Sequence, residues 1–112
     1  MTTKLYTPEE FIAAATLEDG TYWLEADGTD VIVTVPDGAY WREYGLRGHL
    51  SGSITVHGEG DGSAIRRGDG GGHAFRDGNG DGDAIRRGDG DGGAFRRDSG
   101  DGHAIRRGDA NT

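Results

Sequence analysis

The chain has 112 residues with no cysteine, two prolines and one methionine. Without cysteine it forms neither disulfide bonds nor thiolate metal sites. No apolar run is long enough to span a bilayer, and the first residues (MTTKLYTPEEF) lack the apolar stretch of a secretory signal. These absences predict a cytoplasmic protein that does not bind membranes.

Glycine, by contrast, is abundant, with 23 residues, and most of it lies in a ten-residue repeat. From Gly60 the units read GDGSAIRRGD, GGGHAFRDGN, GDGDAIRRGD, GDGGAFRRDS and GDGHAIRRGD. The large apolar residue alternates between units, in the order Ile65, Phe75, Ile85, Phe95 and Ile105. Independent units have no reason to alternate, whereas a coil with two units per turn does. Such fixed-period self-similarity is typical of solenoids.

The repeat predicts a mainly β protein, a flattened parallel β-solenoid with two ten-residue units per rung. Because side chains alternate between the faces of a strand, we expect Ile65 and its counterparts to point inward and Arg66 and its counterparts to point outward. Stacked rungs lie about 4.8 Å apart, so the arginines would form a surface column. We expect the aspartates of the Gly/Asp turns to pair with it in Arg–Asp ladders.

The ten-residue spacing continues toward the N-terminus as Asp-Gly pairs near residues 19, 27 and 37. Strand-like runs of β-branched and aromatic residues lie at 21–26, 30–35, 39–43 and 53–57. Before them, Thr7-Pro8-Glu9-Glu10 forms a capping box with proline at the first helical position, which predicts a helix to about Leu17. This N-terminal α-helix is expected to cap the open end of the coil. The single domain then comprises a cap (1–19), irregular early rungs (20–57) and regular rungs (58–112).

A disordered glycine-rich tail is the alternative to this fold, because such a composition is typical of flexible segments. The Ile/Phe alternation argues against it. The formal net charge is −8, and most of the excess lies in residues 1–57, where nine acids face Lys4, Arg42 and Arg47. An acidic protein avoids nucleic acid and is attracted to basic surfaces. The alternative to a binding role is that the negative charge only keeps the protein soluble.

Catalysis and metal binding receive little support. Ser63, Asp83 and His103 would share one column, but the carboxylate lies between the other two, which is the wrong order for a nucleophile–histidine relay. His73 and His103 would lie on opposite faces, so no zinc or iron site is expected. No phosphate-binding GxxxxGK[ST] motif occurs, and the outward positions lack the regular threonine rows expected of an ice-binding face. We therefore predict no enzyme activity and no cofactor.

Calcium is the one cofactor left open. The Gly/Asp turns are similar to the nonapeptide repeats of calcium-loaded β-rolls. The period here is ten rather than nine, and arginines lie beside the carboxylates. The alternative to a binding function is therefore a structural or calcium-binding β-roll solenoid.

The GDGxAIRRGDGDG pattern of residues 58–112 resembles the Gly/Asp-rich repeats of small proteins from bacterial phages and mobile elements. Some small acidic proteins of that kind are anti-CRISPR inhibitors. The resemblance implies a bacterial host cytoplasm and an inert solenoid that occupies the nucleic-acid-binding surface of a host complex.

The predicted function is thus a protein-binding inhibitor of the acidic nucleic-acid-mimic type, acting on a bacterial nucleic-acid-targeting complex such as a CRISPR effector. Carboxylates would stand in for phosphates against lysines and arginines of the partner. The predicted partner-binding residues are the acids of the first half: Glu9, Glu10, Glu18, Asp19, Glu25, Asp27, Asp30, Asp37 and Glu43. We expect no direct nucleic-acid binding. The C-terminal end has no matching cap, and we expect charge to protect it, with a homodimer through this end as the alternative.

Overall fold

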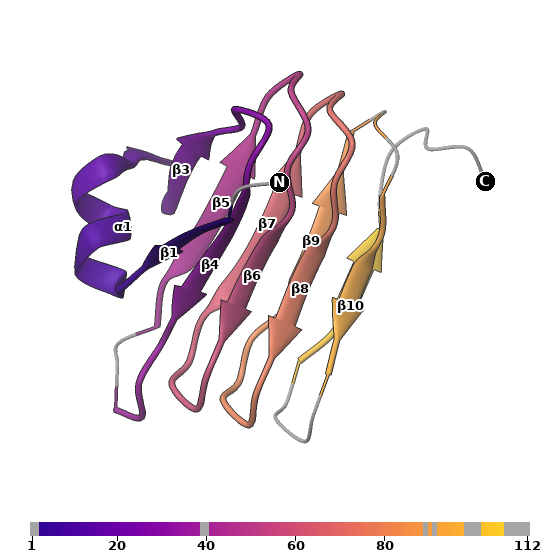
Figure 1. The fold of residues 1–112 in the computed structure, drawn as a ribbon. Helices are drawn as coiled ribbons and strands as arrows, with labels where there is room; N and C mark the ends of the chain where they lie inside the picture. The colour runs from indigo at the N-terminus through magenta and orange to yellow at the C-terminus, as the bar shows by residue number, and fades with distance from the viewer. Residues whose placement is uncertain (1–2, 39–40, 89, 91, 98–101, 107–112) are drawn as a thin grey trace.

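The computed structural model describes residues 3–38, 41–88, 90, 92–97 and 102–106. The chain forms a parallel β-solenoid of about four turns with one short helix near the N-terminus (Figure 1). The predicted fold class is confirmed.

Two sheets form the walls of the coil. Sheet A contains, in spatial order, β1 (Thr3–Tyr6), β4 (Asp30–Thr34), β6 (Ile54–His57), β8 (Ala74–Asp77) and β10 (Ala94–Arg96). Sheet B contains β2 (Thr16–Glu18), β3 (Thr21–Glu25), β5 (Glu43–Arg47), β7 (Ser63–Arg67), β9 (Ala84–Arg87) and β11 (Ala104–Arg106). All described neighbours pair in parallel except β2 and β3, which are antiparallel.

The register places equivalent residues of alternate units side by side. Ile85 pairs with Ile65 on one side and with Ile105 on the other. Phe75 pairs with Phe95, and their rings stack at a centroid distance of 5.3 Å. The predicted columns, with two units per turn, are therefore confirmed.

The predicted orientation of these columns is wrong. Ala64, Ala74 and Ala84 point inward and are fully buried, and so are the side chains of Arg66, Arg76 and Arg86. The isoleucines and phenylalanines lie on the outer faces, where Phe95 is 45% exposed. The physical reason lies in the turns, whose carbonyl oxygens satisfy the buried guanidinium groups.

The first turns of the coil are filled differently. Their interior is apolar and contains Val31, Val33, Ile54 and Val56 from sheet A, and Tyr44 and Leu46 from sheet B. The register joins the two kinds of interior, because Leu46 pairs with Arg66 and Val56 pairs with Arg76. Aliphatic side chains therefore give way to arginine within the same inward columns.

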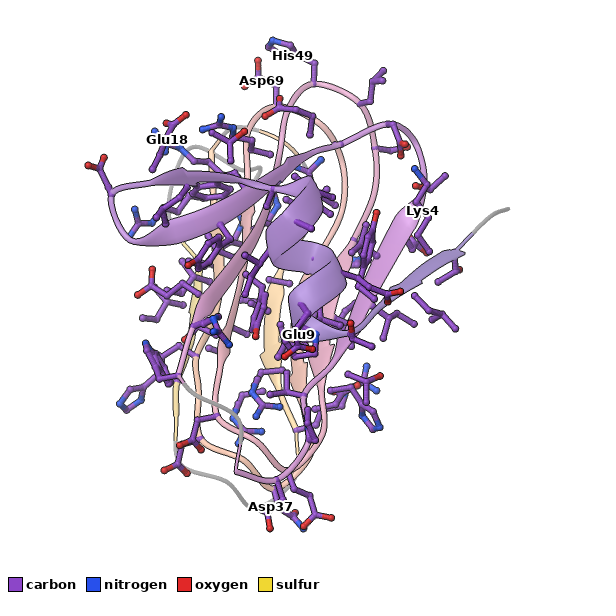
Figure 2. All side chains as sticks on the ribbon, turned by 90° about the vertical axis from the view of Figure 1, so that its left-hand side faces the viewer. Lys4, Glu9, Glu18, Asp37, His49 and Asp69 are labelled. Carbon is purple, nitrogen blue, oxygen red and sulfur yellow. The ribbon has the colours of Figure 1, made fainter. Side chains whose placement is uncertain are left out.

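Helix α1 (Pro8–Ala14) lies over the N-terminal end of the coil (Figures 1 and 2). The predicted capping box is present: the Thr7 backbone N–H donates to Glu10 Oε1 at 2.9 Å, and the Glu10 N–H donates to Thr7 Oγ1 at 3.1 Å. Phe11 is fully buried and packs edge-on against the Tyr44 ring at 5.2 Å.

Three local predictions need adjustment. The helix ends at Ala14 because the following residues pair with β3 as strand β2. Residues 3–6 of the predicted cap segment form strand β1 of sheet A. The strand predicted at 39–43 begins only at Glu43, and residues 39–40 lie outside the described residues.

Candidate binding surfaces

The buried arginines are held by the turns of the preceding rung. Arg76 Nε donates to the Gly62 carbonyl at 2.7 Å, and its Nη2 donates to the Gly60 carbonyl at 2.5 Å. Its Nη1 donates to the carbonyls of Val56, at 3.2 Å, and Asp77. Because guanidinium has five N–H donors in a rigid fork, it satisfies several carbonyl oxygens of one turn at once.

The same arrangement recurs along the coil. The Nε atoms of Arg66, Arg86, Arg96 and Arg106 donate to the carbonyls of Gly52, Gly72, Gly82 and Gly92 at 2.6, 2.9, 3.0 and 2.8 Å. Among the described residues, no carboxylate lies within 4.0 Å of Arg66, Arg76 or Arg96. The predicted Arg–Asp ladders are therefore wrong for this part of the chain, since backbone dipoles take the place of the aspartates.

Burial lowers the pKa of Arg66 and of Arg76. Burial, followed by the charge of Arg86, lowers the pKa of Arg66 to about 10. Burial also lowers the pKa of Arg76, with a smaller contribution from the charge of Arg96. Like charges one rung apart are tolerated because carbonyl oxygens stabilise each cation.

The turn glycines allow this packing. Gly82 has a positive φ of 157°, and a Cβ placed on it would overlap the carbonyl oxygen of Gly62 in the turn of the preceding rung. The same Cβ would also press on the Nε of Arg76. Glycine is thus required here both for backbone conformation and for the close approach of backbone and guanidinium.

Inward arginines leave the corner carboxylates on the surface with few basic neighbours. Asp37, Glu59, Asp61 and Asp81 are exposed at the corners that lead from sheet A to sheet B. The Asp81 N–H donates to Asp61 Oδ1 at 3.1 Å, so that one corner carboxylate is fixed by the next rung. Within the described residues 58–106, the outward arginines are Arg67, Arg87 and Arg97.

These corner acids of the repeat half were not among the predicted partner-binding residues. Acids and arginines are present in similar numbers in residues 58–112, so the sequence predicts little net charge on this half. A signal was present in the repeat itself: alanine and the first arginine are constant in all five units, whereas the intervening residue alternates. Interior positions vary least, because they face identical neighbours in every rung.

The nine predicted acids belong to the first turns of the coil and to the helix. Figure 2 shows three of them well apart, with Glu9 on helix α1, Glu18 near the β2–β3 turn and Asp37 at the opposite corner. Several are already paired. Arg47 binds Glu18 at 2.9 Å and Glu25 at 2.8 Å, and Lys4 binds Asp27 at 2.7 Å.

Pairing shifts the pKa values of these groups. Hydrogen bonds from Lys4 and then Thr29 lower the pKa of Asp27 to about 2. A hydrogen bond from Arg47 lowers the pKa of Glu18. These carboxylates remain charged over the whole physiological range but are less available to a partner.

The remaining predicted acids divide into two groups. Glu10, Asp30 and Glu43 accept local hydrogen bonds from the Thr7 N–H, the Ser53 N–H and the Thr21 hydroxyl. Glu9, Asp19 and Asp37 form no ion pair within the described part of the chain and are exposed. The structure thus leaves a smaller set of accessible acids than predicted and adds the corner acids to it.

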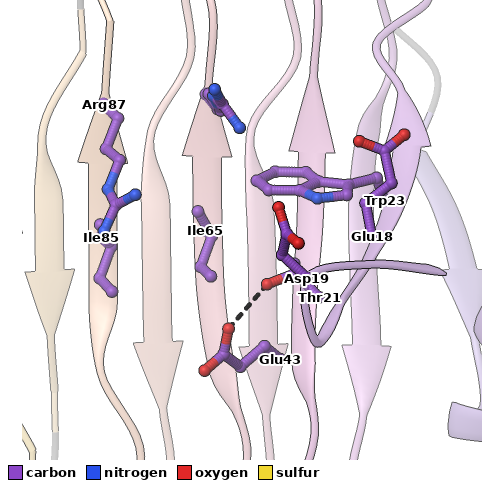
Figure 3. A pocket seen from close by; sticks show the side chains of 9 residues that line it. Glu18, Asp19, Thr21, Trp23, Glu43, Ile65, Ile85 and Arg87 are labelled. Carbon is purple, nitrogen blue, oxygen red and sulfur yellow. Dashed lines mark hydrogen bonds between the residues drawn. The ribbon is translucent and has the colours of Figure 1, made fainter. Parts of the chain in front are cut away.

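A groove lies on the outer face of sheet B, with a volume of about 300 Å³. Its lining residues are Glu18, Asp19, Thr21, Trp23, Glu43, Ile65, Arg67, Ile85 and Arg87 (Figure 3). The Trp23 indole lies over Gly45, where any Cβ would overlap the ring. Ile65 and Trp23 are each only 6% exposed, so that the apolar floor is recessed between charged rims.

The predicted column of Ser63, Asp83 and His103 exists, but it does not form a relay. The Asp83 N–H donates to Ser63 Oγ at 3.1 Å, and the His103 N–H donates to Asp83 Oδ1 at 2.8 Å. These contacts run from backbone to side chain between adjacent rungs. The serine is also only 2% exposed. The column therefore provides hydrogen bonds between rungs rather than an activated nucleophile.

Among the described residues, no group of three or more histidine, aspartate or glutamate side chains is arranged to hold a metal ion. The turn carbonyls, which are potential calcium ligands, already face guanidinium groups. Calcium binding in these turns would have to displace a permanent cation.

Comparison with protein families, curated proteins and solved structures finds no match to this chain. In the part of the chain that the structure describes, no helix has the length and apolar character needed to cross a membrane.

Proposed function

We propose that this protein is a non-enzymatic binding protein that uses its acidic surface to occupy the basic, nucleic-acid-binding surface of a partner protein. A bacterial nucleic-acid-targeting complex, such as a CRISPR effector, is the class of partner that this chemistry fits. The protein would compete with nucleic acid rather than bind it, because its carboxylates repel phosphates.

The segregation of charge between the inside and the outside of the coil carries this proposal. Five arginines point inward, and their guanidinium groups bind backbone carbonyls. These cations offset the net charge at long range, but they are not positioned to contact a partner. Exposed carboxylates such as Asp37, Glu59 and Asp61 therefore form a surface of one sign at short range.

Regular spacing adds to the likeness to a nucleic-acid backbone. Asp61 and Asp81 occupy equivalent places in successive rungs, which lie about 4.8 Å apart. A line of fixed negative charges on a rigid support is the feature that a phosphate-binding surface of lysines and arginines recognises.

The test compares two triple variants with the same change in net charge. D37N/E59Q/D61N neutralises corner acids that form no ion pair with any described residue, whereas E18Q/E25Q/D27N neutralises acids that are already paired. Each tagged protein is used to capture partners from bacterial lysate over a salt series, with DNA as competitor. We expect the corner variant to lose a nucleic-acid-binding protein that the wild-type and paired variants retain, and DNA or salt to release that protein.

Circular dichroism establishes that both variants are folded. Equal capture by the two variants would show that local carboxylates do not define the surface. Capture that DNA does not displace would rule out competition for a nucleic-acid site.

The alternative function, a structural or calcium-binding solenoid, predicts a gain of β-structure on adding calcium, which circular dichroism measures. The homodimer also stays a prediction. Strands β10 and β11 are the last described strands of the two sheets, and light scattering after size-exclusion chromatography measures whether they join two copies.

A further inference from the structure

The outer face of sheet B has three parallel rows of different chemistry. Outward positions at the start of its strands include Glu43 and Asp83, beside Asp19 of the β2–β3 turn. The middle row is apolar and contains Trp23, Ile65 and Ile85, with Gly45 beneath the indole. The last row has Glu25 at its β3 end, and from there the register aligns Arg47, Arg67 and Arg87 in it. The groove of Figure 3 follows the middle row.

The two rims of this groove keep opposite charges. Arg47 is bound by Glu18 and Glu25, but Arg67 and Arg87 have no carboxylate within 4.0 Å among the described residues. The Arg67 guanidinium lies over the Trp23 ring at 5.8 Å. On the opposite rim, Glu43 Oε1 accepts a hydrogen bond from the Thr21 hydroxyl, which is a neutral donor.

The rows are too far apart to neutralise each other. The acidic and basic positions of one strand, such as Glu43 and Arg47, are separated by four residues, which is about 13 Å along an extended chain. A ligand that matches both rims must therefore be as long as a strand segment and carry an apolar group at its centre.

We propose that this groove binds an extended segment of a partner protein in which a basic, an apolar and an acidic side chain occupy positions i, i+2 and i+4. Side chains at these positions point to the same face of an extended chain and span the same distance of about 13 Å. The basic side chain meets Glu43 and Asp19, the apolar side chain fills the recess over Ile65 and Ile85, and the acidic side chain meets Arg67 and Arg87.

The recessed floor favours such a segment over a second copy of this chain. Two copies packed face to face would each present a hollow at the centre of the contact, and unfilled space forfeits the packing that stabilises an interface. A protruding side chain fills the hollow instead. This groove is on a different surface from the corner acids, so the two proposals are independent and are tested separately.

The first experiment is an NMR titration of the full ¹⁵N-labelled chain with the peptide acetyl-Gly-Lys-Ser-Leu-Ser-Glu-Gly-amide, up to millimolar concentration. We expect shifts in the amides of β5, β7 and β9 and in the Trp23 indole N–H, and none in β8 or β10. Matched peptides with Glu→Gln or Leu→Ser should bind more weakly, because each removes one of the three contacts.

Charge reversal makes the test decisive. R67E/R87E should weaken binding of the peptide about tenfold or more, since two charge-assisted contacts become repulsive. It should also gain affinity for a peptide with lysine in place of glutamate. The matched control is R97E, which changes the same repeat position on sheet A and should leave binding unchanged. If R67E/R87E does not fold, R67Q/R87Q provides the comparison.

Four results would overturn the proposal. Three of them are an absence of shifts at millimolar peptide, shifts that map to sheet A, and shifts insensitive to charge reversal at Arg67 and Arg87. A fourth is a change in the same sheet B amides when the protein alone is diluted, which would assign the groove to a second copy of the chain.

Discussion

The early and late turns of this solenoid occupy the same columns with opposite chemistries. In the early turns Tyr44 and Leu46 fill the interior beside sheet B. One rung later, the register replaces them with Ala64 and Arg66. A large apolar pair is thus exchanged for a small residue and a guanidinium group. The comparison teaches that a β-coil is filled equally well by apolar packing or by a cation that binds the carbonyls of its own turns.

The second solution depends on glycine. An arginine-filled turn has its carbonyls converging on the guanidinium, and stacked turns approach so closely that a Cβ at Gly80 or Gly82 would overlap backbone atoms. The early turns carry fewer glycines and are filled by apolar side chains. The glycine content of the late turns is therefore the condition for an arginine core, rather than a mark of disorder.

The largest expected effect comes from removing a guanidinium from the late core. Arg76→Met keeps the bulk of the side chain but leaves several buried carbonyls without donors, each costing about 1–3 kcal/mol. We expect the free energy of unfolding, measured with urea, to fall by about 3 kcal/mol or more. Arg67→Met, which changes an outward arginine, is the control and should cost much less. Similar losses in the two variants would contradict the arginine core.

A smaller effect is expected from adding one methyl group to a stacked turn. Gly82→Ala places a Cβ against the preceding turn, whereas Gly38→Ala meets no atom within 4 Å. Both glycines have positive φ, which costs an alanine about 1–2 kcal/mol. Gly82→Ala should lower the thermal midpoint further, by the added cost of overlap. Equal midpoints would show that the turns do not stack as closely as the structure places them.

A third comparison concerns the two sides of one strand. Ala84 is fully buried, so Ala84→Leu should destabilise the protein by about 1–3 kcal/mol through overpacking. Ile85 faces outward, and Ile85→Ala should cost less, although it removes the larger apolar group. Chemical denaturation measures both. A larger loss of stability in Ile85→Ala than in Ala84→Leu would support the inward isoleucine column that the repeat predicted.

The smallest expected effect is a pH dependence at the early end. The folded pKa of Asp27 is lowered to about 2 from an ordinary value of 3.8, so its contact with Lys4 stabilises the fold above pH 3.8 and is lost as the pH falls through 2. The protection of the β1 amides against hydrogen exchange, relative to an unfolded peptide at the same pH, should therefore decrease over this range. Asp27→Asn should remove this pH dependence, while Asp37→Asn should not. An unchanged profile in Asp27→Asn would exclude this ion pair as its cause.

Much of the fold was predictable from the repeat. The alternation of Ile65, Phe75 and Ile85 requires two units per turn, and it predicted the strand register correctly. The capping box at Thr7 predicted where the helix begins. Strand β2 was missed because three exposed residues form a strand only by pairing with β3.

The prediction of which strand face points inward was wrong, and the predicted binding surface therefore left out the corner acids. Hydrophobicity favours an inward Ile65, and nothing in a single unit reveals that the turn of the preceding rung supplies carbonyls to Arg66. Because the arginines point inward, the corner aspartate Asp61 lacks the arginine partner expected for it and, with Glu59, carries surface charge. The groove on sheet B also depends on the outward isoleucines.

The coil, its period and its columns follow from the repeat alone, because a strict repeat leaves one way to align equivalent strands. Which side of each strand is buried depends instead on contacts between rungs. Strand geometry alone does not select which of the two faces is buried. The free energy of burying arginine depends on hydrogen-bond acceptors that come from a turn 14–18 residues earlier in the chain. Those acceptors come together only when the rungs stack.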